Sequence, residues 1–528
     1  MPARSLPTEL TLELGLDDPE DADAIRNRVA AALRVPEADL PPLVVRKRSL
    51  DARRGRLRFH LLVELGAGQE APGGAPPREV RGEPRVIVVG EGPAGLFCAY
   101  ELARRGIAAL VVERGKLVQP RRHDLKGLNR HGKVDPDSNY CFGEGGAGTY
   151  SDGKLYTRAH KRGPVRDVLE LLAVHGAPES VLVEARPHIG SNRLPKVVTA
   201  LRERLAGVGQ GFRFGARVTG LLTKPAGDGR RIAGVRLADG SELGADAVVL
   251  ATGHSARDVL LLLGEAGVTL QAKPFALGVR IEHPQPLVNR IQYGRAELHP
   301  KVPNATYRLA SQVDGRGVFS FCMCPGGWIV PASTEPGALV VNGMSLARRD
   351  SPFANSGLVV GLEPADWEAL GFRGPLGGIE VQRQIERAAF EAGGGELRAP
   401  AVRAVDFTER RSSSDLPDTS YIPGTVPADL ASVLDVTGLP IADRLRRALR
   451  DFNHSMRGYL TNEAALVGVE TRTSSPVRVP RDPHSLESPD LPGLFPTGEG
   501  AGYAGGIVSA ALDGMRVAER VAAALASR

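Results

Sequence analysis

The chain has few cysteines and no long apolar run, and each of these absences excludes a class of protein. Only four of its 528 residues are cysteine, namely Cys98, Cys141, Cys322 and Cys324, too few for the disulfide framework of a secreted scaffold. No segment has the about 18 consecutive apolar residues of a spanning helix, and the first residues hold no apolar signal core. We therefore expect a cytoplasmic protein with no membrane partner.

The charges and the histidines indicate neither a nucleic-acid partner nor a metal. An excess of 67 lysines and arginines over 61 acidic residues gives a net charge of +6. Without a long Lys/Arg block this balance does not predict nucleic-acid binding, although it suits an anionic substrate or cofactor. His188, His254 and His454 are isolated, without the spacing of metal ligands. We predict no metal site, and a length that corresponds to about three domains.

One stretch carries a complete nucleotide-binding signature. An apolar run at 86–89 ends in Gly90-x-Gly92-x-x-Gly95, a helical stretch follows, and a second apolar run ends in Glu113. Gly90 permits the tight turn, Gly92 lets the backbone approach a pyrophosphate, and Gly95 lets helix pack on strand. Glu113 lies near the offset of about 20 residues at which a carboxylate meets a ribose. The pattern predicts FAD or NAD at the helix N-terminus; its contacts would be Gly90, Gly92, Pro93, Ala94, Gly95, Glu113 and Arg114.

A second segment, residues 142–155, is too rich in glycine to form a helix or a strand. Its glycines allow the backbone to lie close against a flat ligand, and its polar side chains offer contacts. A mobile surface loop is the alternative. The candidate contacts here are Gly145, Gly146, Gly148, Thr149, Ser151, Asp152 and Lys154.

Residues 196–253 favour FAD over NAD. We expect a helix at 196–205, a strand at 212–222, and a hairpin of strands at 231–237 and 242–250 joined by Asp239-Gly240, whose second strand ends in Ala251-Thr252-Gly253. This order resembles FAD domains of the glutathione-reductase type, whereas NAD dehydrogenases continue through further βαβ units. Further candidate contacts are Val218, Ala251, Thr252 and Gly253.

The C-terminal segment 494–507 leads into a helix at 508–524. It resembles the segment of FAD enzymes in which a strand ending in Gly-Asp presents a carboxylate to the ribityl chain. Here Glu499 replaces that aspartate. The helix N-terminus would stabilise negative charge on the flavin and make it easier to reduce, while a structural glycine-rich turn is the alternative. The candidate contacts are Gly498, Glu499, Gly505, Gly506 and Ile507.

Several segments together resemble the family of uncharacterised bacterial FAD-dependent dehydrogenases, also called NAD(P)/FAD-dependent oxidoreductases. The resemblance spans nearly the whole chain and implies a FAD domain, an inserted substrate domain and a two-electron flavin reaction, without indicating the substrate. It also implies that Glu499 is this family's own form of the C-terminal motif. The matching segments are residues 46–52, 143–156, 273–284, 321–327, 341–345, 473–478 and 498–506.

The predicted fold is α/β: a Rossmann-type FAD-binding domain with a β-meander, an inserted α+β substrate domain, and a small N-terminal α+β module. The module is expected as β-α-β-β, with strands at 9–14, 43–45 and 57–65 and a helix at 19–33. The predicted boundaries are 1–65 for the module, 66–84 for a Gly/Pro linker, 85–255 and 491–528 for the FAD domain, and 256–490 for the substrate domain.

Two cysteines and two arginines are candidates for catalysis. Cys322 and Cys324 are two apart on an expected strand and would share a face, as a thiol pair or nucleophile near the flavin or, alternatively, as small buried hydrophobes. Arg280 would clamp a substrate carboxylate or form an ion pair with Glu282 on the same face.

Arg478 is the fourth candidate. With Arg472 in the same loop it would grip an anionic substrate; a solvated loop is the alternative reading.

The predicted reaction is hydride transfer between flavin N5 and a small organic substrate, with FAD bound non-covalently because no attachment motif is present. The sequence has no second strand–GxGxxG–helix unit, so NAD(P)H would only dock transiently as an electron donor. An NAD(P)H-fed flavin reductase or monooxygenase-like enzyme is the first alternative. A FAD-carrying RNA- or protein-binding module is the second, and a catalytically inactive structural protein the third.

Overall fold

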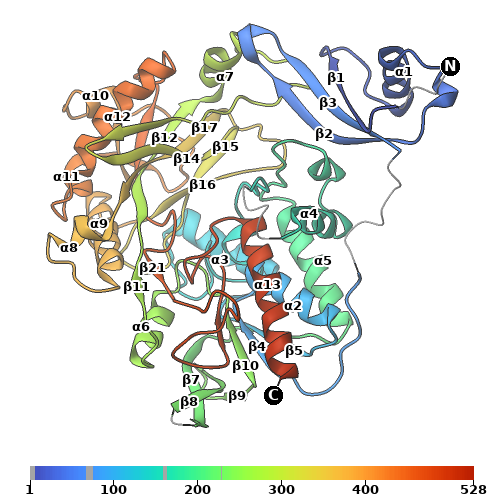
Figure 1. Cartoon of the computed structure of the whole chain (residues 1–528). Helices are drawn as coiled ribbons and strands as arrows, with labels where there is room; N and C mark the ends of the chain where they lie inside the picture. The colour runs from blue at the N-terminus through green and yellow to red at the C-terminus, as the bar shows by residue number, and fades with distance from the viewer. Residues whose placement is uncertain (1–5, 67–74, 158–162, 228, 528) are drawn as a thin grey trace.

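A parallel sheet of five strands carries the nucleotide-binding signature. The structure is a computed structural model and describes residues 6–66, 75–157, 163–227 and 229–527 (Figure 1). Every neighbouring pair in this sheet is parallel, so the carboxyl ends of the strands meet at one edge. The strand order is β22 (Leu494–Pro496), β10 (Ala247–Leu250), β4 (Val86–Val89), β5 (Ala109–Glu113) and β6 (Gly211–Phe214).

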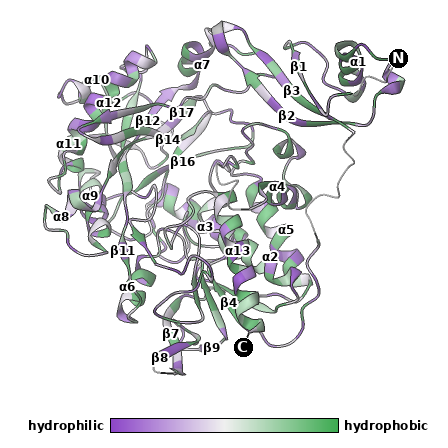
Figure 2. Ribbon diagram, viewed as in Figure 1, coloured by the Kyte–Doolittle hydropathy of each residue, from purple (hydrophilic) through white to green (hydrophobic). Residues whose placement is uncertain are grey.

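Two helices far apart in sequence cover one region of this sheet together. α2 (Pro93–Arg104) follows β4, and α13 (Ile507–Ala526) packs against it so closely that a side chain at Gly514 would overlap the carbonyl of Ala94. Figure 2 shows β4 and α13 as mainly hydrophobic, and all four β4 residues are buried. Helices packed on a parallel sheet explain such a continuous apolar strand.

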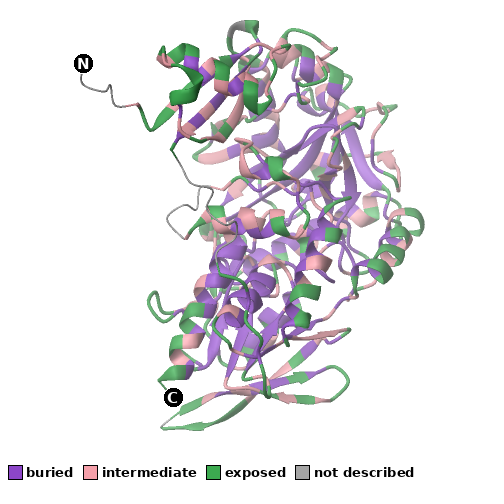
Figure 3. Ribbon diagram, turned by 90° about the vertical axis from the view of Figure 1, so that its right-hand side faces the viewer, coloured by how far each residue is buried: buried purple, intermediate pink, exposed green. Residues whose placement is uncertain are grey.

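A β-meander extends from this half of the protein. β7 (Val218–Ala226), β8 (Gly229–Leu237) and β9 (Glu242–Gly244) form an antiparallel sheet, and Figure 3 shows mainly exposed and intermediate residues at this lower end of the molecule. The single strands expected at 242–250 and at 212–222 were wrong: β9 and β10 belong to different sheets, and so do β6 and β7. The chain turns between them at Gly215, which has a φ of +65°.

The chain leaves the five-stranded sheet after β10 and returns to it at β22, and a larger sheet is formed in between. Its pairs are antiparallel except β18 with β19. Helices α9 (Gly377–Ala392) and α12 (Ile441–Ser455) pack in its core. The strand order is β13 (Ala310–Val313), β14 (Arg316–Cys324), β17 (Phe353–Leu362), β12 (Phe275–Pro284), β20 (Ala465–Glu470), β18 (Ala399–Arg403) and β19 (Thr425–Pro427).

One helix near the start of this long excursion belongs by packing to the first half. α6 (Arg257–Glu265) buries Val259, Leu260 and Leu263 in the same apolar cluster as β10. The large sheet itself begins at β12, so the two halves of the protein meet along α6.

The N-terminal module has the expected order of elements. β1 (Glu9–Leu14), α1 (Ala22–Leu33), β2 (Leu43–Asp51) and β3 (Arg58–Leu65) form a small sheet in the order β1-β3-β2 with a helix against it. Arg48 attaches the module to the rest of the chain, because its backbone N–H donates to Val183 and its carbonyl accepts from Ala185. Among the described residues, no helix is both long and apolar enough to cross a membrane.

Candidate functional site

A cavity of about 480 Å³ lies at the carboxyl ends of β4, β5 and β10; its wall includes Val89 and Glu113, the last residues of β4 and β5, and Ala251, which follows β10. Ligands of open α/β sheets bind at this edge. Most of the predicted cofactor contacts, although distributed over more than 400 residues of sequence, line this one cavity. They are Gly90, Gly92, Pro93, Ala94, Glu113, Arg114, Gly146, Gly148, Ser151, Asp152, Lys154, Val218, Ala251, Thr252, Gly253, Gly498, Glu499, Gly505, Gly506 and Ile507.

Three predicted contacts lie outside this cavity and shape the backbone beside it. A side chain at Gly95 would overlap the carbonyl of Gly90, so this glycine serves the close packing of α2 on its strand. Gly145 has a φ of +76°, and the hydroxyl of Thr149 donates to the carbonyl of Glu144 at 2.8 Å. These residues hold the glycine-rich segment in its fold.

The turn after β4 brings the N-terminus of α2 to the cavity wall. Gly90 has a φ of +99°, and a Cβ there would lie 2.5 Å from the carbonyl oxygen of Ala251. Gly92 is the N-cap of α2 and offers no side-chain hydrogen bond, so the first N–H groups of the helix remain available. Free N–H groups and the positive end of the helix dipole fit a phosphate.

Glu113 connects three parts of the cavity wall. One carboxylate oxygen accepts from the N–H of Glu91 at 3.0 Å, and the other accepts from Gly115 at 2.8 Å and Gly143 at 2.9 Å. The side chain therefore joins the phosphate-binding turn to the glycine-rich segment, in addition to its place beside the cavity.

A buried arginine that the sequence analysis did not identify holds the glycine-rich segment. Arg121, on α3 (Val118–His131), is fully buried and donates to four backbone carbonyls. The acceptors are Asn139 at 2.8 Å, Glu144 at 2.8 Å, Tyr140 at 3.0 Å and Gly146 at 2.9 Å. Because α3 is rich in basic residues, nothing in the pattern distinguished this arginine from a solvated one.

Cys322, Cys324 and Lys154 meet at the wall of the cavity. The Lys154 ammonium lies 3.7 Å from the sulfur of Cys322 and 3.6 Å from that of Cys324. The expectation that both cysteines share one face of a regular strand was wrong. Cys322 has a φ of +45° and the strand register shifts between Phe321 and Cys324, so Cys322 is exposed and lines the cavity while Cys324 is buried.

Arg280 lies behind this cysteine pair, away from the cavity wall. It is fully buried, and Nη1 donates to both Glu470 oxygens at 3.1 Å. The expected pairing with Glu282 and the substrate clamp were both wrong: the Glu282 carboxylate instead accepts from the N–H of Ser420 at 2.7 Å. Glu470 comes from β20, the strand next to β12, which was not apparent from the sequence.

Arg472 and Arg478 do not converge on a ligand, so that expectation was also wrong. Arg472 is buried and donates to the Glu386 carboxylate at 2.8 and 3.0 Å. Arg478 is exposed, outside the cavity, with its guanidinium 5.5 Å from the ring centre of Tyr503. Opposite-charge pairing with a helix of the large half decides the position of Arg472.

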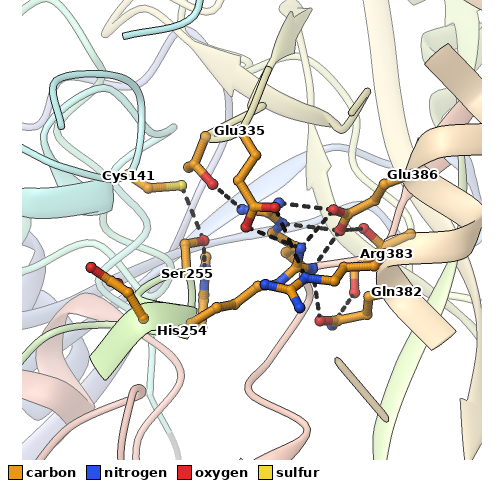
Figure 4. Close-up of polar contacts among 12 residues, drawn as sticks. Cys141, His254, Ser255, Glu335, Gln382, Arg383 and Glu386 are labelled. Carbon is orange, nitrogen blue, oxygen red and sulfur yellow. Dashed lines mark hydrogen bonds and ion pairs between the residues drawn. The ribbon is translucent and has the colours of Figure 1, made fainter. Parts of the chain in front are cut away.

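Figure 4 shows the buried polar network around Glu386 next to a small cluster of cavity residues. His254 Nδ1 lies 2.8 Å from the hydroxyl of Ser255, which donates to the sulfur of Cys141 at 3.4 Å. Burial, together with Arg472 and Arg257, lowers the pKa of His254 to about 4, so the imidazole is neutral at pH 7. Within the described ranges no group of three or more His, Cys, Asp or Glu is arranged for a metal.

Several cavity residues were missed although they adjoin predicted ones. Asp258, for example, was missed, although its carboxylate accepts from the predicted Arg114 at 2.9 Å. Adjacency to the glycine motifs was the available signal for most of them. They are Val89, Val112, Cys141, Phe142, Ala147, Gly153, Tyr156, Ala216, Arg217, His254, Ser255, Ala256, Asp258, Val259, Phe321, Ala504 and Ala510.

Comparisons with known proteins agree with this architecture and identify domains of FAD-dependent proteins in the chain. Residues 83–125 match the model of a FAD-binding domain, residues 274–473 that of a FAD-dependent protein, C-terminal domain-like, and residues 7–66 that of a domain of unknown function. An uncharacterized protein of Clostridium beijerinckii is 39% identical over 537 residues, 97% of either chain. The chain belongs to this family of FAD-dependent proteins, and FAD is its cofactor.

The solved structures that the chain matches are distant. A triple mutant of the flavin-dependent brominase Bmp2 is 12% identical with a TM-score of 0.36, over 84% of this chain and 81% of that one. CtdE in complex with FAD is 13% identical with a TM-score of 0.34, over 84% and 88%. A geranylgeranyl bacteriochlorophyll reductase-like protein of Thermoplasma acidophilum is 14% identical with a TM-score of 0.35, over 84% and 78%.

Proposed function

We propose that the protein transfers a hydride between FAD held in this cavity and a small organic substrate. The observation that carries the proposal is the meeting of three distant glycine segments, represented by Gly92, Gly146 and Gly506, in one cavity wall. The turn at Gly90 and Gly92 would hold the pyrophosphate, and Glu113 would face the adenosine ribose. Bound FAD would supply two-electron chemistry.

The C-terminal segment would face the flavin. α13 begins at this wall with Gly506 as an N-cap that offers no side-chain hydrogen bond, so its dipole stabilises negative charge there. Withdrawal from water raises the pKa of Glu499, on the same wall, to about 7. The segment therefore combines a positive helix end with a carboxyl group that is partly protonated at neutral pH.

The position of Lys154 favours the proposal that the substrate is anionic. Its ammonium lies 3.0 Å from Asp152, and that carboxylate also accepts from Arg349 at 2.6 Å. Burial alone would raise the pKa of Asp152, but Lys154 and Arg349 lower it below its ordinary value. The Lys154 ammonium, which lines the cavity, would therefore be available to a substrate carboxylate or phosphate as well as to Asp152 and the nearby Cys322 sulfur.

The test is anaerobic reduction of the purified full chain, monitored through the visible absorption spectrum of the protein. We expect a yellow protein whose FAD is released on denaturation and is bleached by small anionic metabolites without nicotinamide. Bleaching by NADH or NADPH alone would instead support the NAD(P)H-fed reductase or monooxygenase-like enzyme. A chain that takes up no FAD would contradict the proposal. Lys154→Met should weaken reduction by an anionic substrate at least about tenfold, whereas Lys196→Met, an exposed lysine, should not.

A further inference from the structure

We propose that Cys322 and Cys324 form a redox-active dithiol that exchanges two electrons with FAD. The inference rests on the proposed FAD site, because Cys322 lines the same cavity as the predicted cofactor contacts. Neither cysteine is in a disulfide in the structure. The exposed sulfur of Cys322 is the one that an external thiol or disulfide can reach, whereas Cys324 is fully buried.

The backbone of this segment places both sulfurs beside the Lys154 ammonium. Cys322 adopts a left-handed conformation, which is unfavourable for a residue with a side chain. The register shift beside it is a bulge, a feature that redirects side chains next to active sites. Arg280 Nη2 donates to the carbonyl of Cys322 at 3.1 Å and lies 3.9 Å from the sulfur of Cys324, which holds the irregular segment in place.

The pKa values of the two cysteines are shifted in opposite directions. The hydrogen bond from Cys324, together with the charges of Lys154 and Arg280, lowers the pKa of Cys322. The same hydrogen bond and burial raise the pKa of Cys324. The anions that oppose these two cations are Asp152 and Glu470, each of which is paired with one of them. A thiolate beside a protonated thiol is the arrangement that thiol–disulfide chemistry requires.

The reaction balances without a further reagent. The Cys322 thiolate and the Cys324 thiol form one S–S bond, the S–H bond of Cys324 breaks, and two electrons and one proton pass to oxidised FAD. In the reverse direction reduced FAD returns two electrons and one proton, and the S–S bond breaks. Lys154 would stabilise the Cys322 thiolate in both directions.

Anaerobic titration of the air-oxidised full chain with dithionite tests the proposal. We expect the wild-type protein to consume about two equivalents per FAD, one for the flavin and one for the disulfide, because each couple takes two electrons. Cys322→Ser/Cys324→Ser should consume about one, a twofold difference. Cys98→Ala, which removes a buried cysteine of α2, should behave as wild type.

Equal consumption by the wild type and the double variant would overturn the dithiol while leaving the FAD site intact. A wild-type chain without bound FAD would overturn the FAD site itself. Peptide mapping after alkylation gives a readout independent of activity: a Cys322–Cys324 disulfide should appear after oxidation and disappear after reduction, and its absence after oxidation would count against the proposal.

The thiolate can be tested without removing either cysteine. Lys154→Met should slow iodoacetamide alkylation of Cys322 at neutral pH by about tenfold and move its pH profile upward, because a neighbouring cation favours the thiolate. Lys154→Arg should retain most of the rate, and Lys196→Met all of it. An unchanged profile in Lys154→Met would contradict the assigned role of Lys154.

Discussion

The guanidinium of Arg257 and the carboxylate of Glu386 form two hydrogen bonds, of 3.0 and 2.8 Å, across 129 residues of sequence. Arg257 begins α6, beside the parallel sheet, whereas Glu386 lies on α9 of the large half. Arg472 donates to the same carboxylate. One buried anion thus joins two cations and fixes the two halves around the cavity.

Removal of this anion should destabilise the protein strongly. Glu386→Gln leaves Arg472 buried without its counter-charge and Arg257 with only the more exposed Glu335, at 3.3 Å, and we expect a loss of about 3 to 5 kcal/mol in the free energy of unfolding by urea. Glu380→Gln, an exposed change on the same helix, should cost less than about 0.5 kcal/mol. Similar losses in both variants would show that the network contributes nothing specific.

The same carboxylate predicts a pH dependence. Burial alone would raise the pKa of Glu386, but Arg257 and Arg472 lower it to about 2, from an ordinary value of 4.5. Its contribution to stability is therefore complete above the unfolded pKa and is lost as the pH falls from about 4.5 towards 2. The free energy of unfolding should decline over this range, and Glu386→Gln should decline less steeply.

Gly90 should tolerate no side chain. In Gly90→Ala the Cβ would meet the carbonyl of Ala251, a backbone atom that cannot move away, and the φ of +99° adds strain. We expect loss of FAD from the purified protein and a lower free energy of unfolding, by at least about 2 kcal/mol. Gly106→Ala, also at positive φ but in open space, should cost only about 1 kcal/mol and retain FAD. If the two variants lost the same free energy of unfolding and did not differ in FAD retention, the loss would come from the positive φ alone and not from the contact with Ala251.

Arg121 should be required for the glycine-rich segment. Arg121→Met removes a donor from four buried carbonyls; those of Glu144 and Gly146 keep a bond from Thr149, whereas those of Asn139 and Tyr140 lose the donor that the structure gives them, and each unsatisfied group costs about 1 to 3 kcal/mol. We expect a loss of at least about 3 kcal/mol together with weaker FAD retention in equilibrium dialysis. Arg130→Met, exposed on the same helix, serves as the matched control and should behave as wild type.

Glu499 should make FAD binding depend on pH near neutrality. Because withdrawal from water raises its pKa to about 7, the carboxyl group becomes negative as the pH rises from 6 to 8, in a cavity that must also hold two phosphates. The affinity for FAD should fall by about fivefold over this range. Glu499→Gln should bind FAD with little change between pH 6 and 8. If the affinity of the wild-type protein for FAD rose with pH over this range, the predicted direction would be wrong.

Local patterns predicted many of the elements and singled out segments that line one cavity. Three segments could each be identified from the sequence on its own: the glycine motif after β4, the residues from Ala251 to Gly253, and the C-terminal segment. The reason is that a tight turn and a close backbone approach need glycine at fixed positions. These residues line one cavity in the structure. The strand expected at 212–222 failed because the chain changes sheets at Gly215, and a turn that separates two sheets leaves only a weak local signal.

By itself, the sequence determined the cofactor class, the parallel sheet and the residues that surround the cavity, since these depend on short-range spacing and backbone freedom. Only the tertiary structure decided which charges meet. Arg280 pairs with Glu470 across 190 residues, Arg472 with Glu386 across 86, and Lys154 meets Cys322 across 168. Partners that far apart in sequence are selected by the packing of strands and helices, and the need to neutralise buried charge then fixes each pair.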